Sequence, residues 1–226
     1  MAAVQLKIDI VSDVVCPWCA VGIHSLERAL DTLRGEVEAS LHLEPYELNP
    51  DIAPEGEDVV EHLHAKYGST AAQIQANGEA ITRRGAAVGF TFHMDRRDRI
   101  VNTFDAHRLL YWAAEEGAPS AQLALKHALL RAYFTDGQNP SDHAVRLRLA
   151  DEVGLDGQRA QEVLETDAFD SDVRTRENFF RQRGISGVPA VIVNNRHLIQ
   201  GGQPPEVFAQ ALRQIAAARA ATATAT

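Results

Sequence analysis

The segment Cys16-Pro17-Trp18-Cys19 decides the fold, because it stands between a predicted strand and a predicted helix. Residues 6–10, which precede it, alternate apolar and polar side chains with the period of two that is typical of a strand. The residues after it show the apolar stripe of a helix, formed by Cys19, Ile23, Leu26, Leu30 and Leu33. Residues 37–43 alternate again and complete a strand–helix–strand unit, which predicts parallel strands joined by a right-handed crossover.

The middle of the chain has a different pattern. From about residue 58 to residue 183 it lacks long β-branched runs, and Gly and Pro residues punctuate it. Its apolar spacing predicts seven successive helices, near residues 58–67, 70–86, 103–117, 119–134, 141–153, 157–166 and 168–183. Within this region only residues 89–94 are predicted to be extended.

Strand character returns near the C-terminal end, at residues 190–193 and 197–200, which flank a turn of two asparagines. A last helix follows a pair of prolines. The two ends therefore have the orders βαβ and ββα, and their strands can complete one sheet. We predict an α/β protein in which residues 1–57 and 184–226 form one discontinuous domain and residues 58–183 form an inserted, all-helical domain.

The amino-acid composition argues against several classes of function. The 226 residues include 22 Lys and Arg against 31 Asp and Glu, a formal net charge of −9. This balance argues against nucleic-acid binding and against docking on anionic lipid, because both need basic patches. The N-terminal residues lack the basic and apolar regions of a signal peptide, and no apolar window reaches the ~18 residues of a membrane span. With two cysteines in all, we expect a cytoplasmic protein and not a disulfide scaffold.

The predicted helix gives the two thiols different chemistry. Pro17 suits its first position, because the missing N–H would be unpaired there, and this makes Cys16 the N-cap. Unpaired backbone N–H groups and the positive end of the helix dipole favour the thiolate of Cys16. Cys19 falls on the apolar stripe, so it is turned inward and is less ionised. This asymmetry suits disulfide exchange, in which Cys16 attacks a substrate disulfide and Cys19 resolves the mixed disulfide.

The residues alone leave two other roles open for the cysteine pair. A structural disulfide across so short a loop would stabilise the fold by only about 2 kcal/mol in the chain-entropy model. A zinc site needs about four ligands, of which the pair supplies two. The close histidine pair, His62 and His64, diverges on a helix because residues two apart do not share a face. We expect no metal site and no bound cofactor.

Together with Gly187-Val188-Pro189 far downstream, the cysteine motif resembles the DsbA-like thioredoxin-fold oxidoreductases. The segments Asn102-Thr103-Phe104-Asp105-Ala106-His107-Arg108-Leu109 and Gly201-Gly202-Gln203-Pro204 are similar to the FrnE-type cytoplasmic branch of that family. The resemblance covers nearly the whole chain and implies a thioredoxin-like fold with a helical insertion. The related 2-hydroxychromene-2-carboxylate isomerases and kappa-class glutathione transferases share the insertion but typically carry serine in place of Cys16.

The resemblance also implies roles for residues outside the cysteine pair. It makes Val188–Pro189 a cis peptide that faces the thiols, with the backbone of Val188 offered to the substrate. Pro17 and Trp18, between the thiols, belong to the same contact surface. His107 is expected on the active-site side of the helical domain, where it either contacts the substrate or serves as hydrogen-bonded structure.

Two expectations concern the chemistry of the thiols themselves. Asp13, three residues before Cys16, either relays the proton of Cys19 or caps the turn between strand and helix. Trp18 cannot supply the positive charge that a histidine would add near Cys16. We therefore expect a disulfide that is less oxidising than that of a periplasmic oxidant, whose potential is about −120 mV.

The sequence thus predicts a cytoplasmic thiol:disulfide oxidoreductase whose partners are protein or small-molecule thiols and disulfides. Glutathione is expected as a co-substrate and not as a held cofactor, and the resemblance allows a homodimer. Two alternatives come from other classes. A glutathione-dependent isomerase or transferase acting on a small aromatic substrate would not need Cys19. A non-catalytic module that binds peptides in the thioredoxin groove would need neither thiol.

Overall fold

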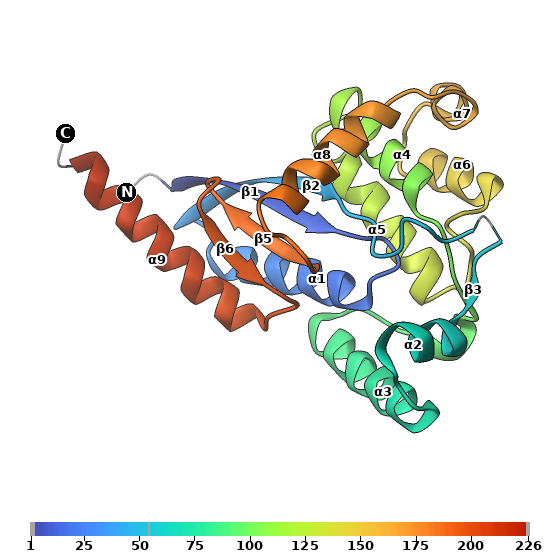
Figure 1. Ribbon diagram of the computed structural model, residues 1–226. Helices are drawn as coiled ribbons and strands as arrows, with labels where there is room; N and C mark the ends of the chain where they lie inside the picture. The colour runs from blue at the N-terminus through green and yellow to red at the C-terminus, as the bar shows by residue number, and fades with distance from the viewer. Residues whose placement is uncertain (1–2, 54, 225–226) are drawn as a thin grey trace.

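The computed structural model of the protein describes residues 3–53 and 55–224, and a sheet lies at its centre (Figure 1). The sheet has the strand order β2-β1-β5-β6. Its strands are β1 (Val4–Ser12), β2 (Val37–Pro45), β5 (Ala190–Val193) and β6 (His197–Gln200). β1 pairs in parallel with β2, and β5 runs antiparallel to both β1 and β6. The predicted α/β fold is confirmed, because both ends of the chain contribute strands to one sheet.

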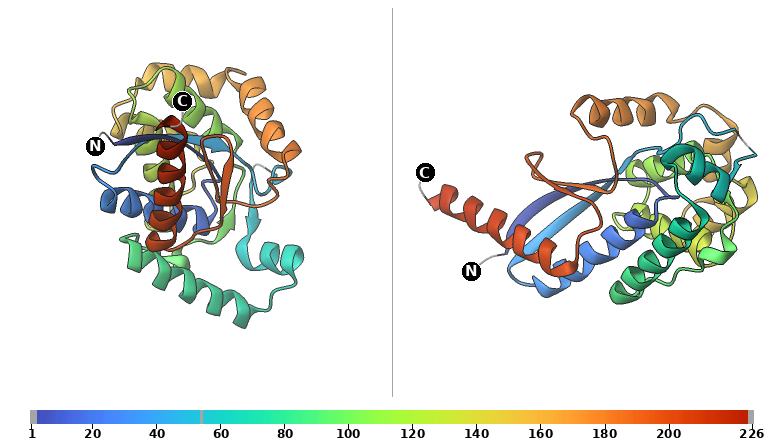
Figure 2. Two further views of the ribbon diagram at one scale, coloured as in Figure 1. Left: turned by 90° about the vertical axis from the view of Figure 1, so that its left-hand side faces the viewer. Right: turned by 60° about the horizontal axis from the view of Figure 1, so that its bottom comes forward.

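Side-chain alternation in β1 explains how the two faces of the sheet are covered. One face buries three residues of β1 in the main apolar core: Leu6, Ile8 and Ile10. On this side α1 (Pro17–Thr32) and α9 (Pro205–Thr224) pack against each other, as Figure 2 shows. Val11 belongs to a second, smaller cluster together with Phe180 of α8 (Asp170–Gln182), which covers the opposite face.

Seven α-helices lie between β2 and β5 in the described chain, and their bounds fall within a few residues of the predicted ones. They are α2 (Val59–Tyr67), α3 (Ala71–Val88), α4 (Phe104–Glu115), α5 (Ala121–Phe134), α6 (His143–Glu152), α7 (Gly157–Glu165) and α8. Local capping fixes several starts: Thr70 and Gln73 form a capping box, and Asp58, Asp142 and Asp156 each accept N–H groups of the helix that follows. None of the described helices is both long enough and apolar enough to cross a bilayer.

Residues 89–94, predicted to be extended, form no strand: Gly89 is the left-handed C-cap of α3, and Met94 begins the 3₁₀ turn Met94–Arg96. Phe90 and Phe92 are buried and meet edge to face at 4.7 Å, and Phe92 meets Phe134 at 5.2 Å. The alternation in the sequence therefore reflects an aromatic cluster. The sequence also failed to indicate the short pair of β3 (Glu57–Asp58) and β4 (Arg99–Ile100), which run antiparallel.

The inserted helices and the sheet share one apolar core. α4 and α5 contact each other and strand β2, and α3 packs on α1. Trp112 of α4 and Phe134 of α5 belong to the same buried cluster as Ile8 of β1 and Phe208 of α9. The division into two domains therefore stays a prediction. The shared core holds α4 and α5 beside the point where β1 ends and α1 begins.

Candidate active site

The two cysteines lie at the N-terminus of α1, just beyond the end of β1. Cys16 is the N-cap, with an extended backbone (φ −95°, ψ 112°), and Pro17 begins the helix. The backbone N–H of Cys19 donates to the carbonyl of Cys16 over 3.0 Å. Both side chains are free thiols, and Cys16 keeps 4% of its accessible surface while Cys19 keeps none. The helix thus holds one thiol at the edge of the surface and encloses the other, as predicted.

The loop before β5 reaches the same point from the other end of the chain. The Val188–Pro189 peptide bond is cis, and the carbonyl oxygen of Val188 accepts a hydrogen bond from Cys16 Sγ at 3.7 Å. Pro189 is buried and stands directly before β5, where it does not have to donate to the ladder. The fold therefore brings both residues to the outer thiol, although most of the chain separates them from it.

Two glycines permit this close approach. A Cβ atom on Gly22 would lie 2.9 Å from Cγ of Pro189, and one on Gly202 would lie 2.9 Å from the carbonyl oxygen of Trp18. Both distances are shorter than real Cβ contacts, so a larger residue at either position would push α1 away from its neighbours. Gly202 lies in a segment that carries the resemblance, but the sequence indicated no role for either glycine.

Asp13 lies in the turn between β1 and α1 and is completely buried. Its Oδ1 accepts the backbone N–H of Val14 at 2.7 Å, and its Oδ2 accepts that of Leu48 at 2.8 Å. The Nε2 atom of His107 lies 3.3 Å from Oδ1. Burial alone would raise the pKa of Asp13. The hydrogen bond and charge of His107, the Leu48 N–H and the charge of a nearby lysine outweigh burial and hold that pKa below its ordinary value.

His107 lies on α4 inside the protein, where 1% of its surface is accessible. The enclosed imidazole faces Asp13, which agrees with the predicted role as hydrogen-bonded structure and leaves the side chain no surface for contact with substrate. Its neighbour Arg108 is also buried and pairs with Asp105 at 3.0 Å and with Asp170 at 2.5 Å. Arg108 thereby joins α4 to the start of α8 and has a structural role.

Lys126 of α5 is a buried member of the site that the sequence analysis missed. Its Nζ atom donates to the carbonyl of Ser12 at 3.3 Å, and its side chain is among the largest fully enclosed ones. Burial lowers the pKa of Lys126, while attraction to Cys19, Asp13 and Cys16 opposes that shift. Its burial could have been inferred from its position on the apolar stripe of α5, three residues after Leu123.

The enclosed thiol of Cys19 differs in acidity from an exposed thiol. Burial raises the pKa of Cys19 well above its ordinary value, and the hydrogen bond and charge of Cys16 raise it further. The positive charge of Lys126 and the backbone of Asp13 act in the opposite direction. Cys19 therefore ionises less readily than an exposed thiol.

Two exposed aromatic side chains lie near Cys16. Trp18 keeps 39% of its surface accessible and Tyr67, the last residue of α2, keeps 61%. Burial raises the pKa of Tyr67, and the charge of Cys16 raises it further, which places the phenol within electrostatic reach of the thiol. The ammonium of Lys66 lies 5.6 Å from the centre of the Tyr67 ring. The helical insertion thus contributes to the surface around the site, and the sequence gave no indication of Tyr67.

The structure brings seven of the eight predicted site residues to one place beside the outer thiol or directly behind it. Asp13 and the two cysteines lie at the turn into α1 and its first residues, and Val188, in the loop before β5, contacts Cys16. Pro17, Trp18 and Pro189 complete this group, whereas His107 stands behind Asp13. In chemical terms the arrangement is a pair of thiols of unequal accessibility, backed by a buried ionised carboxylate and a buried amine.

Comparison with known proteins agrees with the resemblance found in the sequence. Residues 7–213 match the model of the DSBA-like thioredoxin domain. The chain is 26% identical over 208 residues to the uncharacterized protein YwbO of Bacillus subtilis (strain 168), covering 92% of this chain and 96% of YwbO. It is 35% identical to the probable DsbA oxidoreductase SCO1869 from Streptomyces coelicolor, with a TM-score of 0.85 over 92% of this chain and 89% of that one.

A third similar protein, compared by its solved structure, shares only the fold with this chain. The cytosolic disulfide reductase DsbM from Pseudomonas aeruginosa, in a structure with GSH, is 18% identical to this chain. It superimposes with a TM-score of 0.62 over 92% of this chain and 98% of its own. The family model spans almost the whole sheet and all the inserted helices. The chain therefore belongs to the family of DSBA-like thioredoxin domains.

Proposed function

We propose that the protein is a cytoplasmic thiol:disulfide oxidoreductase that works through Cys16 and Cys19. The observation that carries the proposal is the unequal environment of the two thiols. Cys16 lies at the helix N-terminus against the carbonyl of Val188, while Cys19 is fully enclosed with a raised pKa. Disulfide exchange needs one thiol that meets the substrate and one that acts only afterwards.

The reaction follows from this order of access. The thiolate of Cys16 attacks one sulfur of a substrate disulfide, so that a Cys16–substrate bond forms and the second substrate sulfur leaves as a thiolate. Cys19 then releases its proton and attacks Cys16 Sγ, which breaks the Cys16–substrate bond, so that the first substrate sulfur also leaves as a thiolate and both substrate thiolates take up protons. The protein ends with a Cys16–Cys19 disulfide, and the substrate has gained two electrons and two thiols. The reverse sequence oxidises a substrate dithiol.

Lys126 and Asp13 take part in the second step through their charges. The ammonium of Lys126 stabilises the Cys19 thiolate at the moment it forms. The carboxylate of Asp13 opposes the cost of burying Lys126. Since both oxygens of Asp13 already accept hydrogen bonds from Val14 and Leu48, Asp13 acts as a positioning residue.

The surface around Cys16 suits extended chains and small thiols. The exposed rings of Trp18 and Tyr67 offer apolar contact near Cys16, and the backbone at Val188 offers polar contact. The chain has a single cysteine pair, so the reducing equivalents must come from outside. Glutathione fits this requirement as a co-substrate, and the likeness to a cytosolic reductase structure with GSH is consistent with it.

Turnover with an insulin-type disulfide and glutathione tests the proposal. Wild-type protein should accelerate reduction, and both Cys16→Ser and Cys19→Ser should fall to the uncatalysed rate. Full turnover by Cys19→Ser would contradict dithiol exchange and favour a glutathione-dependent isomerase or transferase. An inactive wild type that binds peptide as tightly as the Cys16→Ser/Cys19→Ser variant would contradict catalysis and indicate a binding module.

A further inference from the structure

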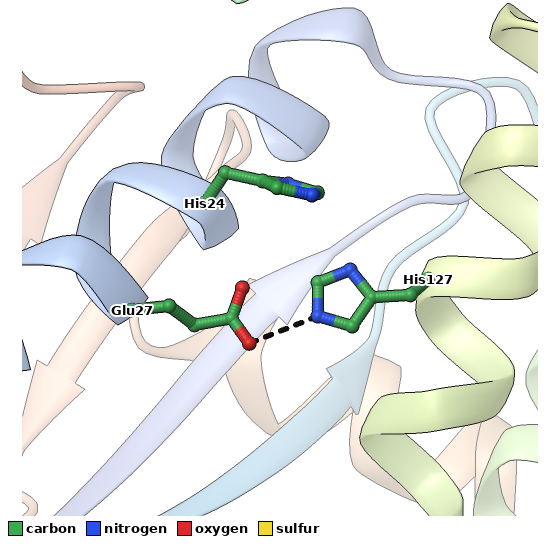
Figure 3. Close-up of side chains that lie close together, drawn as sticks. All are labelled: His24, Glu27 and His127. Atoms are coloured by element: carbon green, nitrogen blue, oxygen red, sulfur yellow. Dashed lines mark hydrogen bonds and ion pairs between the residues drawn. The ribbon is translucent and has the colours of Figure 1, made fainter. Parts of the chain in front are cut away.

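We infer that His24, Glu27 and His127 form a binding site for one zinc ion between α1 and α5. Figure 3 shows the three side chains converging from the two helices. His24 and Glu27 are three residues apart on α1 and therefore share a face, while His127 reaches across from α5. The ligand atoms they offer all lie within 4.8 Å of one another.

The hydrogen bond of His24 leaves its Nε2 atom available to bind a metal ion. Its Nδ1 atom lies 2.9 Å from the carbonyl oxygen of Ala20, one turn earlier on α1. A carbonyl can only accept, so Nδ1 carries the proton in the neutral ring and Nε2 keeps a lone pair. A backbone carbonyl that fixes the tautomer and orientation of a histidine is the usual support for a metal ligand.

The other two ligands are already held together. The Nε2 atom of His127 lies 2.9 Å from Oε1 of Glu27, and both side chains are about one-third exposed. In a tetrahedral zinc site with ligand bonds of about 2.0–2.1 Å, neighbouring ligand atoms are roughly 3.3 Å apart. A zinc ion would therefore replace this hydrogen bond with little movement of either side chain.

Aromatic packing holds the ring of His24 in place. The ring packs edge to face against Phe90, with ring centres 5.0 Å apart, and against His127, with ring centres 4.7 Å apart.

One side of the cluster is open. His24, Glu27 and His127 line a groove of about 760 Å³, which leaves room for water as a fourth ligand. The nearest positive charge in the groove is Arg131, one turn beyond His127. Its guanidinium is paired with Glu152 at 3.0 Å and with Asp136 at 3.7 Å, so its charge is largely offset.

The chemistry of the donors favours zinc over magnesium and calcium. Two imidazole nitrogens and one carboxylate oxygen with an open fourth position suit zinc, whereas magnesium and calcium prefer oxygen ligands. The sequence predicted no metal site, because the ligands come from helices that are far apart in the chain. Bound zinc would join α1, whose N-cap is Cys16, to α5, which carries Lys126.

Zinc titration of the Cys16→Ser/Cys19→Ser variant tests the inference, because this background removes the thiols as competing ligands. Calorimetry with Zn²⁺ alone should show one ion per chain, and the melting temperature should rise with zinc and return with EDTA. His24→Ala and His127→Ala should each weaken binding by at least ~10-fold, since losing even an outer-sphere partner costs about that much. His197→Ala, an exposed histidine on β6, is the matched control and should leave binding unchanged.

A second variant distinguishes loss of a zinc ligand from misfolding of the protein. Glu27→Gln keeps a hydrogen-bond acceptor for His127 and removes the carboxylate, so it should retain the circular dichroism spectrum of its parent and still lose zinc affinity. Cobalt(II) should give the absorption of a tetrahedral site without a thiolate charge-transfer band. Absence of zinc binding in the background variant, or binding that His24→Ala and His127→Ala leave unchanged, would overturn the inference.

Discussion

The Nε2 atom of His107 lies 3.3 Å from Oδ1 of Asp13, and both side chains are enclosed by the protein. This contact joins α4 of the inserted helices to the turn that carries the redox helix. Lys126 makes a second such connection, from α5 to the carbonyl of Ser12. The insertion is therefore part of the electrostatic environment of the thiols as well as a neighbour of the sheet.

Removing the imidazole should destabilise the fold through Asp13. In His107→Ala the carboxylate loses one of its three hydrogen bonds and stays buried, which should reduce the free energy of unfolding by about 1–3 kcal/mol. Urea denaturation at neutral pH measures this loss. His197→Ala, on the exposed face of β6, should change the same quantity by less than about 0.5 kcal/mol. Equal effects of the two substitutions would refute the proposed contact.

The lowered pKa of Asp13 gives stability a defined dependence on pH. A carboxyl whose pKa is lower in the folded protein stabilises it above the unfolded value of ~3.9, and this contribution is lost as pH falls through the folded value. The stability difference between wild type and Asp13→Asn should therefore be constant near neutral pH and shrink below about pH 4. Asp51→Asn makes the same charge change at an exposed position and should show no such trend.

The amine of Lys126 should matter for the second step of exchange as well as for folding. Lys126→Met keeps the length of the apolar stem but removes a buried positive charge that favours the carboxylate of Asp13, so the free energy of unfolding should fall. Without that charge the pKa of Cys19 should rise further, so the mixed disulfide should resolve more slowly at neutral pH. Stopped-flow rates of resolution across pH measure the shift. A resolution profile identical to wild type would contradict this role, and Lys7→Met on β1 serves as the control.

Close packing at Gly22 can be tested with a single methyl group. Gly22→Ala places a Cβ atom 2.9 Å from Pro189, so it should slow exchange and destabilise the protein by about 1–3 kcal/mol through overpacking. Gly78→Ala is the matched control, because Gly78 lies within α3 and its Cβ would meet open space. That substitution should stabilise the helix by about 0.5–1 kcal/mol and leave exchange unchanged. An active, stable Gly22→Ala would show that the contact is not needed.

The potential of the Cys16–Cys19 pair tests the effect of Trp18. Equilibration with glutathione should give a potential clearly below the roughly −120 mV of a strong periplasmic oxidant. Trp18→His should shift it upward, because a charged imidazole stabilises the reduced, thiolate form. A wild-type value near that of the periplasmic oxidant would refute this expectation.

Local patterns in the sequence predicted the sheet, the helices and the position of the thiols. Alternation at residues 6–10 and the stripe that begins at Cys19 depend on neighbours within one element, so they can be recognised in a single chain. Proximity between distant segments could not be predicted in this way. Lys126 reaches the thiols only because α5 packs on β2, and β3 pairs with β4 only because the intervening helices bring them together. His107 was assigned to the correct side of the site, but its burial depended on packing.

Trapping with Cys19→Ser tests the central claim most directly. This variant should capture a partner as a mixed disulfide on Cys16, and mass spectrometry of the adduct would identify both the sulfur and the partner. The Cys16→Ser/Cys19→Ser variant should capture nothing under the same conditions. Recovery of Cys19→Ser with a free Cys16 thiol after exposure to cell extract and to glutathione disulfide would contradict the account, whereas a dithiol-reversible adduct on Cys16 is the result it predicts.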